Sequence, residues 1–363
     1  MSPSNLPVLF PFAEYWWFYL AFIVFVIGLL ALDLGVFHRK AHAVSFKEAT
    51  AWTCVWVTLA LTFNVLLYYY ARWSFANNET LMAIPGFDPA KEAGRIALEF
   101  LAGYLVEQSL SVDNIFVFVL VFSYFHVKPQ YQHRVLFYGI LGALVFRGIF
   151  IAIGAALMQY KAVVYLLGAF LVFTGFKMMF GGEAKIEPEK NPITRLFKKI
   201  MPVSHEFEGQ KFFSRKGGVL HATPLFIVLL VLEATDVVFA IDSVPAIFGL
   251  TKEPLIVFTS NIFAILGLRS LYFLLAGAVD KFHFLKYGLA VVLTFVGLKM
   301  TVLGWLFGGH FPIGWSLGII AGTLFASVML SLAFPQKETP HIHVEGDVYD
   351  DKGHHTNKHT HIP

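Results

Sequence analysis

Residues 219–249 form a long apolar run, and positions 232–245 within it read LEATDVVFAIDSVP. This run is long and apolar enough to cross the hydrocarbon core of a bilayer, which is about 30 Å thick. It nevertheless carries three carboxylates, on Glu233, Asp236 and Asp242. A charged side chain near the bilayer centre costs at least about 2.5 kcal/mol, so such residues usually have a function. We therefore expect a transmembrane helix that contributes acidic side chains to a functional site.

The whole chain has the composition of a membrane protein. Of its 363 residues, 57% are hydrophobic and only 14% are charged, whereas soluble domains average about 25% charged residues. Nine apolar runs are long enough to span a bilayer. They are residues 14–37, 46–71, 96–125, 135–157, 161–181, 219–249, 254–277, 282–308 and 312–334. The sequence thus predicts an all-α polytopic membrane protein with about nine transmembrane helices.

The Lys and Arg residues predict how these helices are oriented. With the N-terminus outside, 18 of the 27 Lys and Arg residues fall in or beside the cytoplasmic connections, and five fall on the opposite side. Cytoplasmic loops carry such an excess of positive charge. We expect a multi-pass protein of the inner (plasma) membrane, with the N-terminus outside and the C-terminus in the cytoplasm. The first run lacks the flanks of a cleaved signal peptide and is expected to remain as a span.

Two parts of the chain repeat each other. FTGFKMM at 173–179 matches FVGLKMT at 295–301 with an offset of 122, and the same offset places Arg147 on Arg269. Each repeat contains three predicted spans. Because three is an odd number, the second copy would enter the membrane from the opposite side. Inverted repeats of this kind are common in secondary transporters, whose substrate sites lie near the bilayer midplane.

An offset of 123 likewise places Asp113 on Asp236. A duplicated scaffold without transport is the alternative to a transporter. The expected organisation is two N-terminal helices in 1–92, the first three-helix repeat in 93–182, a cytoplasmic loop in 183–217, the second repeat in 218–309, a final helix in 310–335 and a His-rich cytoplasmic tail in 336–363.

The first helix of each repeat is expected to be broken. Residues 93–125 would form a continuous helix of about 50 Å, longer than the bilayer core. The counterpart at 219–250 contains Pro245, which cannot complete the helical hydrogen bonding. In a regular helix Glu107 and Asp113 would point about 120° apart, so they would converge only if the segment between them unwinds. Broken helices at matching positions mark substrate sites in transporters.

The polar residues within the spans form a set of oxygen donors. It comprises five carboxylates and one amide: Glu107, Asp113, Asn114, Glu233, Asp236 and Asp242. Oxygen ligands favour Mg²⁺, Ca²⁺ or Mn²⁺ over Zn²⁺ or Cu²⁺. Arg147 and Arg269, near the middles of their spans, either form structural ion pairs or compensate the carboxylates when metal is absent and so take part in gating. Two Arg leave about three negative charges to be balanced by protons or a cation.

Two other features have limited meaning. The single Cys54 lies within an apolar run, which excludes a disulfide framework within the chain and a thiolate metal site. The tail PHIHVEGDVYDDKGHHTNKHTHIP at 340–363 holds six histidines. Short His-rich tracts can bind metal, and a solvated tail without such a role is the alternative.

At its acidic motifs the chain resembles the TerC family of integral membrane proteins, especially its Alx-like members. The motifs are EQSLSVDN at 107–114 and EATDVVFAIDSVPA at 233–246, and the resemblance extends from about residue 14 to 334. The family is associated with tellurite resistance and pH response, and its Alx-like members with manganese export from the cytoplasm. The resemblance implies metal binding by six residues of the two motifs: Glu107, Asp113, Asn114, Glu233, Asp236 and Asp242.

Three functions are compatible with these observations: a divalent-cation exporter with manganese as substrate, a membrane subunit that handles metal for other proteins (metal loading or a tellurite-resistance complex), and an intramembrane enzyme. An enzyme is not expected, because no nucleophile motif is present and the polar groups outnumber a carboxylate dyad. The chain also lacks a nucleotide-binding motif, so returning protons are expected to drive export, with sodium as the rival. The expected partners are the lipid bilayer, the divalent cation and protons, with no nucleic acid and no resident cofactor.

Overall fold

A computed structural model describes residues 7–32, 44–181, 201–204, 207–216, 218–276, 282–307 and 311–334. Among these residues, nine helices are long and apolar enough to cross a membrane. They are α1 (Phe12–Leu32), α2 (Phe46–Ala76), α4 (Pro89–Tyr124), α5 (Pro129–Leu157), α6 (Lys161–Phe180), α8 (Pro224–Phe248), α9 (Pro254–Leu275), α10 (Leu285–Leu298) with its π-helical extension η5 (Lys299–Leu303), and α12 (Ile313–Ala333). The prediction of an all-α polytopic membrane protein is confirmed.

Short elements connect the spans. Helix α3 (Glu79–Met82) follows α2, helix α11 (Gly304–Leu306) follows η5, and strands β1 (Phe213–Lys216) and β2 (Val219–Ala222) precede α8. The predicted His-rich tail and most of the predicted loop 183–217 lie outside the described residues.

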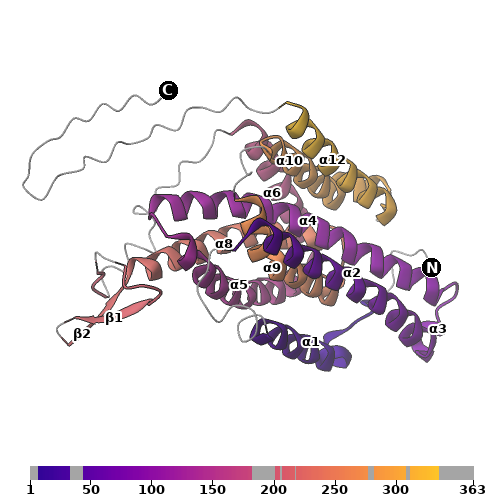
Figure 1. Ribbon diagram of the computed structural model, residues 1–363. Helices are drawn as coiled ribbons and strands as arrows, with labels where there is room; N and C mark the ends of the chain where they lie inside the picture. Colours follow the sequence, from indigo (N-terminus) through magenta and orange to yellow (C-terminus); the bar gives the residue numbers. More distant parts are fainter. Residues whose placement is uncertain are drawn as a thin grey trace, which may run out of the picture.

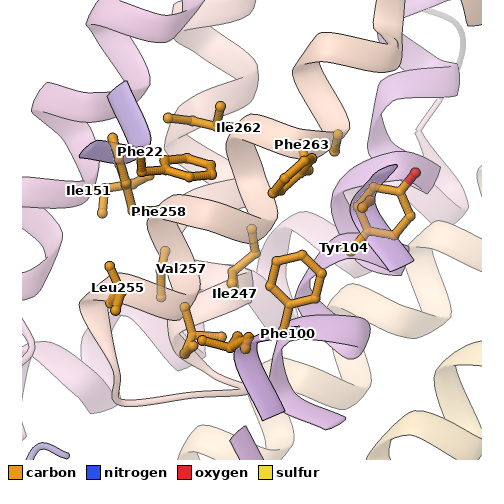
Figure 2. Packing of buried hydrophobic residues seen from close by; sticks show 14 of the residues in the cluster. Phe22, Phe100, Tyr104, Ile151, Ile247, Leu255, Val257, Phe258, Ile262 and Phe263 are labelled. Atoms are coloured by element: carbon orange, nitrogen blue, oxygen red, sulfur yellow. The ribbon is translucent and has the colours of Figure 1, made fainter. Parts of the chain in front are cut away.

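Helix α9 is the central helix of the bundle (Figure 1). Of its most apolar 18 residues, 94% are buried, and it packs against α2, α4 and α5. Figure 2 shows part of this core, where the rings of Phe100 and Phe263 meet edge to face at 6.0 Å between centroids. The ring of Phe22, from α1, approaches Phe263 to 5.5 Å. The centre of the protein is therefore a tightly packed apolar layer around one helix.

Each helix of the first predicted repeat packs against a helix of the second. Helix α4 packs against α9, α5 against α8, and α6 against α10. At the α6–α10 seam, a Cβ on Gly168 would lie 3.0 Å from the carbonyl oxygen of Gly297, and a Cβ on Gly175 would lie 2.7 Å from that of Ala290. Adding the offset of 122 to position 168 gives 290, and subtracting it from 297 gives 175. The two residue pairs are therefore equivalent, as a two-fold relation between the repeats requires. The inversion of the repeats across a membrane stays a prediction.

The predicted breaks in the acidic helices were wrong. Helix α4 continues for 36 residues through the acidic motif, and α8 continues for 25 residues. In α4 the hydroxyl of Ser109 donates to the carbonyl oxygen of Leu105 within the helix, so this serine bonds to the helical backbone instead of opening it. In α8, Pro245 removes the hydrogen bond to the carbonyl oxygen of Ile241, but it lies in the last turn, so only three helical residues follow this gap.

A β-hairpin occupies a segment predicted as loop and span. Strands β1 and β2 pair antiparallel, with Phe213 opposite Ala222 and Lys216 opposite Val219. Helix α8 therefore begins at Pro224, five residues later than predicted. Proline is well suited to the first turn of a helix because its missing N–H would have no partner there.

Candidate functional site

The side chain of Arg147, from α5, is buried at the centre of the protein and bridges two carboxylates. Its Nη1 group donates to Oε1 of Glu107, on α4. Its Nη2 group donates to Oδ1 of Asp236, on α8, at 3.0 Å, and its Nε group lies 3.4 Å from Oδ2 of the same residue. All three side chains are at most 5% exposed. One cation thus holds acidic groups from both predicted repeats.

Helix α9 adds an amide to this network. The Oδ1 atom of Asn261 accepts a hydrogen bond from Arg147 Nη1 at 3.1 Å, and its Nδ2 group donates to Oε2 of Glu107 at 3.2 Å. The hydroxyl of Ser243, on α8, lies 3.5 Å from Arg147 Nη1. We call Glu107, Arg147, Asp236, Ser243 and Asn261 the central network. Sequence reasoning missed Asn261, although an amide within an apolar span was a signal for it.

Buried polar groups continue along α4 from the central network. Ser111 and Asn114 follow Glu107 by four and seven residues, so they share its face of the helix. Both side chains are 1% exposed. Within the described part of the chain, neither the Ser111 hydroxyl nor either polar atom of the Asn114 amide has a hydrogen-bond partner. Such orphaned groups are rare in proteins and call for a water or an ion as partner.

A small cavity adjoins the central network on the other side of Asp236. Its volume is about 20 Å³, enough for one water-sized particle. The residues that line it are Phe118, Leu136, Gly139, Ile140, Ala143, Leu232, Glu233, Asp236, Leu268 and Arg269. The Oε2 atom of Glu233 is buried and has no hydrogen-bond partner among the described residues. Glu233 and Arg269 therefore lie beside the central network and share this cavity with Asp236.

The remaining two predicted ligands lie elsewhere. Asp242 faces α6, where Thr174 Oγ1 lies 3.4 Å from its Oδ1 atom and Lys177 supplies a nearby positive charge. Asp113 interacts electrostatically with Lys286. Because α4 is a regular helix, Asp113 does not converge with Glu107. In this arrangement, no three His, Cys, Asp or Glu side chains of the described residues are grouped to hold a metal ion.

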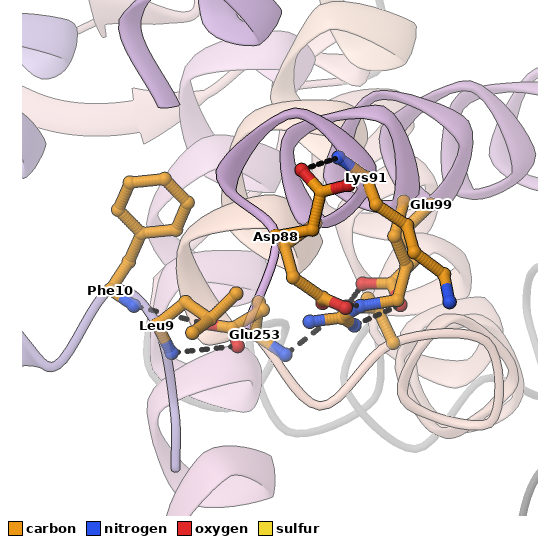
Figure 3. Close-up of polar contacts among 9 residues, drawn as sticks. Leu9, Phe10, Asp88, Lys91, Glu99 and Glu253 are labelled. Atoms are coloured by element: carbon orange, nitrogen blue, oxygen red, sulfur yellow. Dashed lines mark hydrogen bonds and ion pairs between the residues drawn. The ribbon is translucent and has the colours of Figure 1, made fainter. Parts of the chain in front are cut away.

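A second polar cluster lies at the end of the bundle where α4 and α9 begin (Figure 3). The carboxylate of Glu253 accepts hydrogen bonds from the backbone N–H groups of Leu9, at 2.9 Å, and Phe10, at 3.1 Å. Burial raises the pKa of Glu253 to about 7, and the two N–H donors oppose this shift. Through these hydrogen bonds, Glu253 holds the segment before α1 against the start of α9.

The same cluster contains a second buried acid, Glu99. Its Oε1 atom accepts from Arg95 Nη1 at 2.5 Å, and its Oε2 atom accepts from the hydroxyl of Thr251 at 2.5 Å. Arg95 also donates to Glu92 at 2.7 Å, and the charge of Lys299 acts on Glu99. Glu99 precedes Glu107 by eight residues, a little over two turns of α4, so this cluster and the central network are joined by the same helix.

The chain has clear relatives. A sequence model described as Integral membrane protein TerC family matches residues 92–339. The chain belongs to the TerC family. The match begins in the first turn of α4 and extends beyond α12, so it contains every member of the central network.

This TerC chain is similar in sequence to membrane proteins of several organisms. It is 48% identical over 312 residues to an uncharacterized membrane protein of Myxococcus xanthus, covering 86% of this chain and 90% of that one. It is 45% identical over 312 residues to the putative membrane-bound redox modulator Alx of Escherichia coli K12, covering 85% and 92%. It is 48% identical over 243 residues to the thylakoid membrane protein TERC, chloroplastic, of Arabidopsis thaliana, covering 67% and 63%. No solved structure matches the chain.

Proposed function

We propose that this TerC protein exports a divalent cation, manganese, from the cytoplasm in exchange for protons. The observation that carries the proposal is the buried Arg147 guanidinium bridging Glu107 and Asp236. Two carboxylates from different helices converge on one cation inside the helical bundle. In the exporting orientation, the end where α5 and α8 begin faces the cytoplasm of a plasma membrane, as the Lys and Arg distribution predicts.

The ligand set suits the proposed substrate. If Arg147 withdraws, a cation in its place meets carboxylate oxygens from Glu107 and Asp236, the amide oxygen of Asn261 and the hydroxyl of Ser243. All of these donors are oxygens, the type that Mg²⁺, Ca²⁺ and Mn²⁺ prefer. Arg147 and the metal then compete for the same carboxylates. The network described above corresponds to the arginine-bound state of the cycle.

We assign Glu233 and Asn114 the task of receiving the cation as it enters or leaves. Glu233 lies one helical turn before Asp236, beside a cavity that admits one water-sized particle. Asn114 is buried on the same face of α4 as Glu107. We assign Arg269, which lines the same cavity, the task of compensating Glu233 when the site is empty. Asp113 and Asp242 stay candidate metal ligands only in a different conformation, in which the helices have rearranged and brought them to the central network.

A redox function, suggested by the name of the Escherichia coli relative, has less support in this chain. Thiol redox cycles need two cysteines that can form and break a disulfide. The chain contains one cysteine, and Cys54 is exposed on the apolar surface of α2. The central network, by contrast, contains only carboxylate, guanidinium, amide and hydroxyl groups.

Coupling to protons follows from the energetics of export. Moving two positive charges outward against 100 mV costs about 4.6 kcal/mol before any concentration gradient. Carboxylates that lose a metal ion within an apolar protein readily take up protons. At least two protons are therefore expected to enter for each Mn²⁺ exported. A pH-sensitive dye trapped in vesicles tests this coupling: a sodium-dependent flux without a dye response would exclude it.

Mn²⁺ binding to the purified protein tests the site itself. The electron paramagnetic resonance signal of free Mn²⁺ reports the bound fraction in a titration. Asp236→Asn is expected to weaken binding by at least about tenfold, since even outer-shell changes at metal sites cost this much. The matched control is Glu79→Gln, which removes an exposed carboxylate from α3. Equal affinity of wild type and Asp236→Asn would refute the assignment.

A further inference from the structure

The hairpin of β1 and β2 stands apart from the helical bundle. It projects beyond the helix ends on the side where α5 and α8 begin (Figure 1). Its strands pair antiparallel from Phe213 opposite Ala222 to Lys216 opposite Val219. Gly218, directly before β2, has a φ of 82°, a left-handed conformation that glycine adopts without strain. The paired strands give the hairpin a defined shape.

The base of the hairpin is fixed to the transmembrane helices. The backbone N–H of Thr223 donates to the carbonyl oxygen of Phe212 at 2.9 Å, and the Thr223 hydroxyl donates to that of Lys211 at 2.7 Å. The ring of Phe213 lies 4.6 Å from that of Phe226, in the first turn of α8. The guanidinium of Arg134, in α5, lies 5.2 Å from the ring centre of Phe212. These contacts set the direction of the hairpin relative to the membrane spans.

The outer part of the hairpin exposes apolar side chains. Phe213 is 42% exposed, Leu220 43% and Val219 53%. A two-stranded hairpin is marginally stable in water and needs an apolar surface to pack against. Phe213 packs in part against Phe226 of α8, but a large part of all three side chains is left uncovered by the bundle. They are therefore available to a partner that lies beside the ends of α5 and α8.

The strand register places a cation among the apolar groups. Arg215 lies directly opposite Leu220, and Phe213 is two residues before Arg215, so all three side chains share one face. Arg215 is exposed, as is Lys211 just before the strand. A face that combines aromatic and aliphatic side chains with cations is typical of segments that bind at the surface of a membrane with anionic lipids.

We propose that this hairpin is an interfacial anchor, and that the face carrying Phe213, Arg215 and Leu220 binds anionic phospholipid headgroups. Two observations favour a lipid over a soluble partner. The first is continuity. Strand β2 ends at Ala222, and the membrane span α8 begins at Pro224, so the hairpin starts at the bilayer surface. The second is charge complementarity between the cations and lipid phosphates. The inference does not depend on what the protein transports.

A fluorescent probe on the hairpin of the full-length protein tests this proposal. Leu220→Cys, in a Cys54→Ala background, provides a single labelling site at an exposed position on the proposed face. The labelled protein is placed in nanodiscs, which leave both membrane faces accessible, with either neutral lipid alone or about one third anionic lipid. Quenching of the probe by headgroup-labelled lipid then reports contact with the membrane surface, and quenching by iodide reports exposure to water.

The expected result is stronger lipid quenching and weaker iodide quenching in discs that contain anionic lipid. Arg215→Gln is expected to lower the preference for anionic discs about fivefold, the effect of one basic residue near a charged membrane. Raising the salt concentration should reduce the preference of the wild type. The matched control is Lys91→Gln, an exposed cation in the first turn of α4, at the other end of the bundle.

Two results would overturn the proposal. One is full iodide access to the probe in discs of both compositions, which is the result expected if the hairpin instead docks a soluble protein. The other is equal loss of lipid contact in Arg215→Gln and Lys91→Gln. Phe213→Ser gives an independent check, since it removes the apolar part of the contact and should raise iodide access without changing the salt dependence.

Discussion

The guanidinium of Arg147 donates to the carboxylate of Asp236 at 3.0 Å, although 89 positions separate the two residues in sequence. This contact joins α5 of the first predicted repeat to α8 of the second. Both side chains are buried, so each charge depends on the other for compensation. A buried pair of this kind adds little stability relative to apolar residues, but breaking it is costly. The pair therefore both fixes the fold and limits what else can occupy the site.

Removing the cation should destabilise the protein. Arg147→Ala leaves Glu107 and Asp236 without their shared partner, and the loss is expected to be about 3–5 kcal/mol. Thermal unfolding in detergent measures it, with Arg72→Ala, an exposed residue of α2, as control. Any folded Arg147→Ala protein should bind Mn²⁺ more tightly, because the competing guanidinium is gone. Unchanged stability together with unchanged affinity would show that Arg147 plays no part in the site.

Removing the amide should have a smaller effect. Asn261→Leu deprives Glu107 Oε2 of its donor, and an unsatisfied buried partner costs about 1–3 kcal/mol. Ser260→Ala is a matched control on the same helix, because the Ser260 hydroxyl bonds only weakly to its own helix, at 3.3 Å from the carbonyl oxygen of Val257. The two unfolding temperatures should differ by several degrees. If Ser260→Ala proved as damaging as Asn261→Leu, the loss would reflect packing rather than the hydrogen bond.

The seam between α6 and α10 should tolerate no added carbon. In Gly175→Ala the new Cβ would lie 2.7 Å from the carbonyl oxygen of Ala290, and overpacking of this kind costs about 1–3 kcal/mol. In Gly318→Ala, within α12, the new Cβ meets nothing within 4 Å. That change should be neutral or stabilising, since alanine favours a helix over glycine by about 1 kcal/mol. Equal unfolding temperatures for the two variants would contradict the close approach.

The pKa of Glu253 predicts a pH-dependent stability. It is 4.5 ordinarily and about 7 in the folded protein. Between these values the folded protein holds a proton that the unfolded chain has lost, so this contribution to stability, on the order of a few kcal/mol, falls as the pH rises from about 4.5 to 7 and is constant above. The difference between wild-type and Glu253→Gln unfolding temperatures, measured from pH 4 to 9, isolates it. A difference that does not vary with pH would contradict the shifted pKa.

The spans and the acidic motifs could be predicted from the sequence because hydropathy and buried charge are local signals. Eighteen or more apolar residues in succession suffice to place a helix in the bilayer. The importance of Glu107, Arg147 and Asp236 was also visible, since a charge within such a run is expensive wherever it lies. Their meeting, however, depends on how α4, α5 and α8 pack.

The missed features depend on tertiary contacts. Pro245 was expected to break α8, but it lies in the last turn, and the helix continues through it to Phe248. Asp113 was grouped with Glu107 on the assumption that α4 unwinds, and the regular helix separates them. Asn261 and Glu253 carry no motif, and their roles come from partners 154 and 244 positions away in sequence. No pattern within a span reveals such partners.

Manganese transport in vesicles that contain only this protein tests the central claim most directly. The initial rate of Mn²⁺ movement, driven by an imposed proton gradient, is compared among wild type, Asp236→Asn and Glu79→Gln. We expect transport by wild type and Glu79→Gln, and a rate for Asp236→Asn no higher than that of empty vesicles, with equal amounts of folded protein in each preparation. Transport by Asp236→Asn at the wild-type rate, or none by the wild type itself, would contradict the central claim.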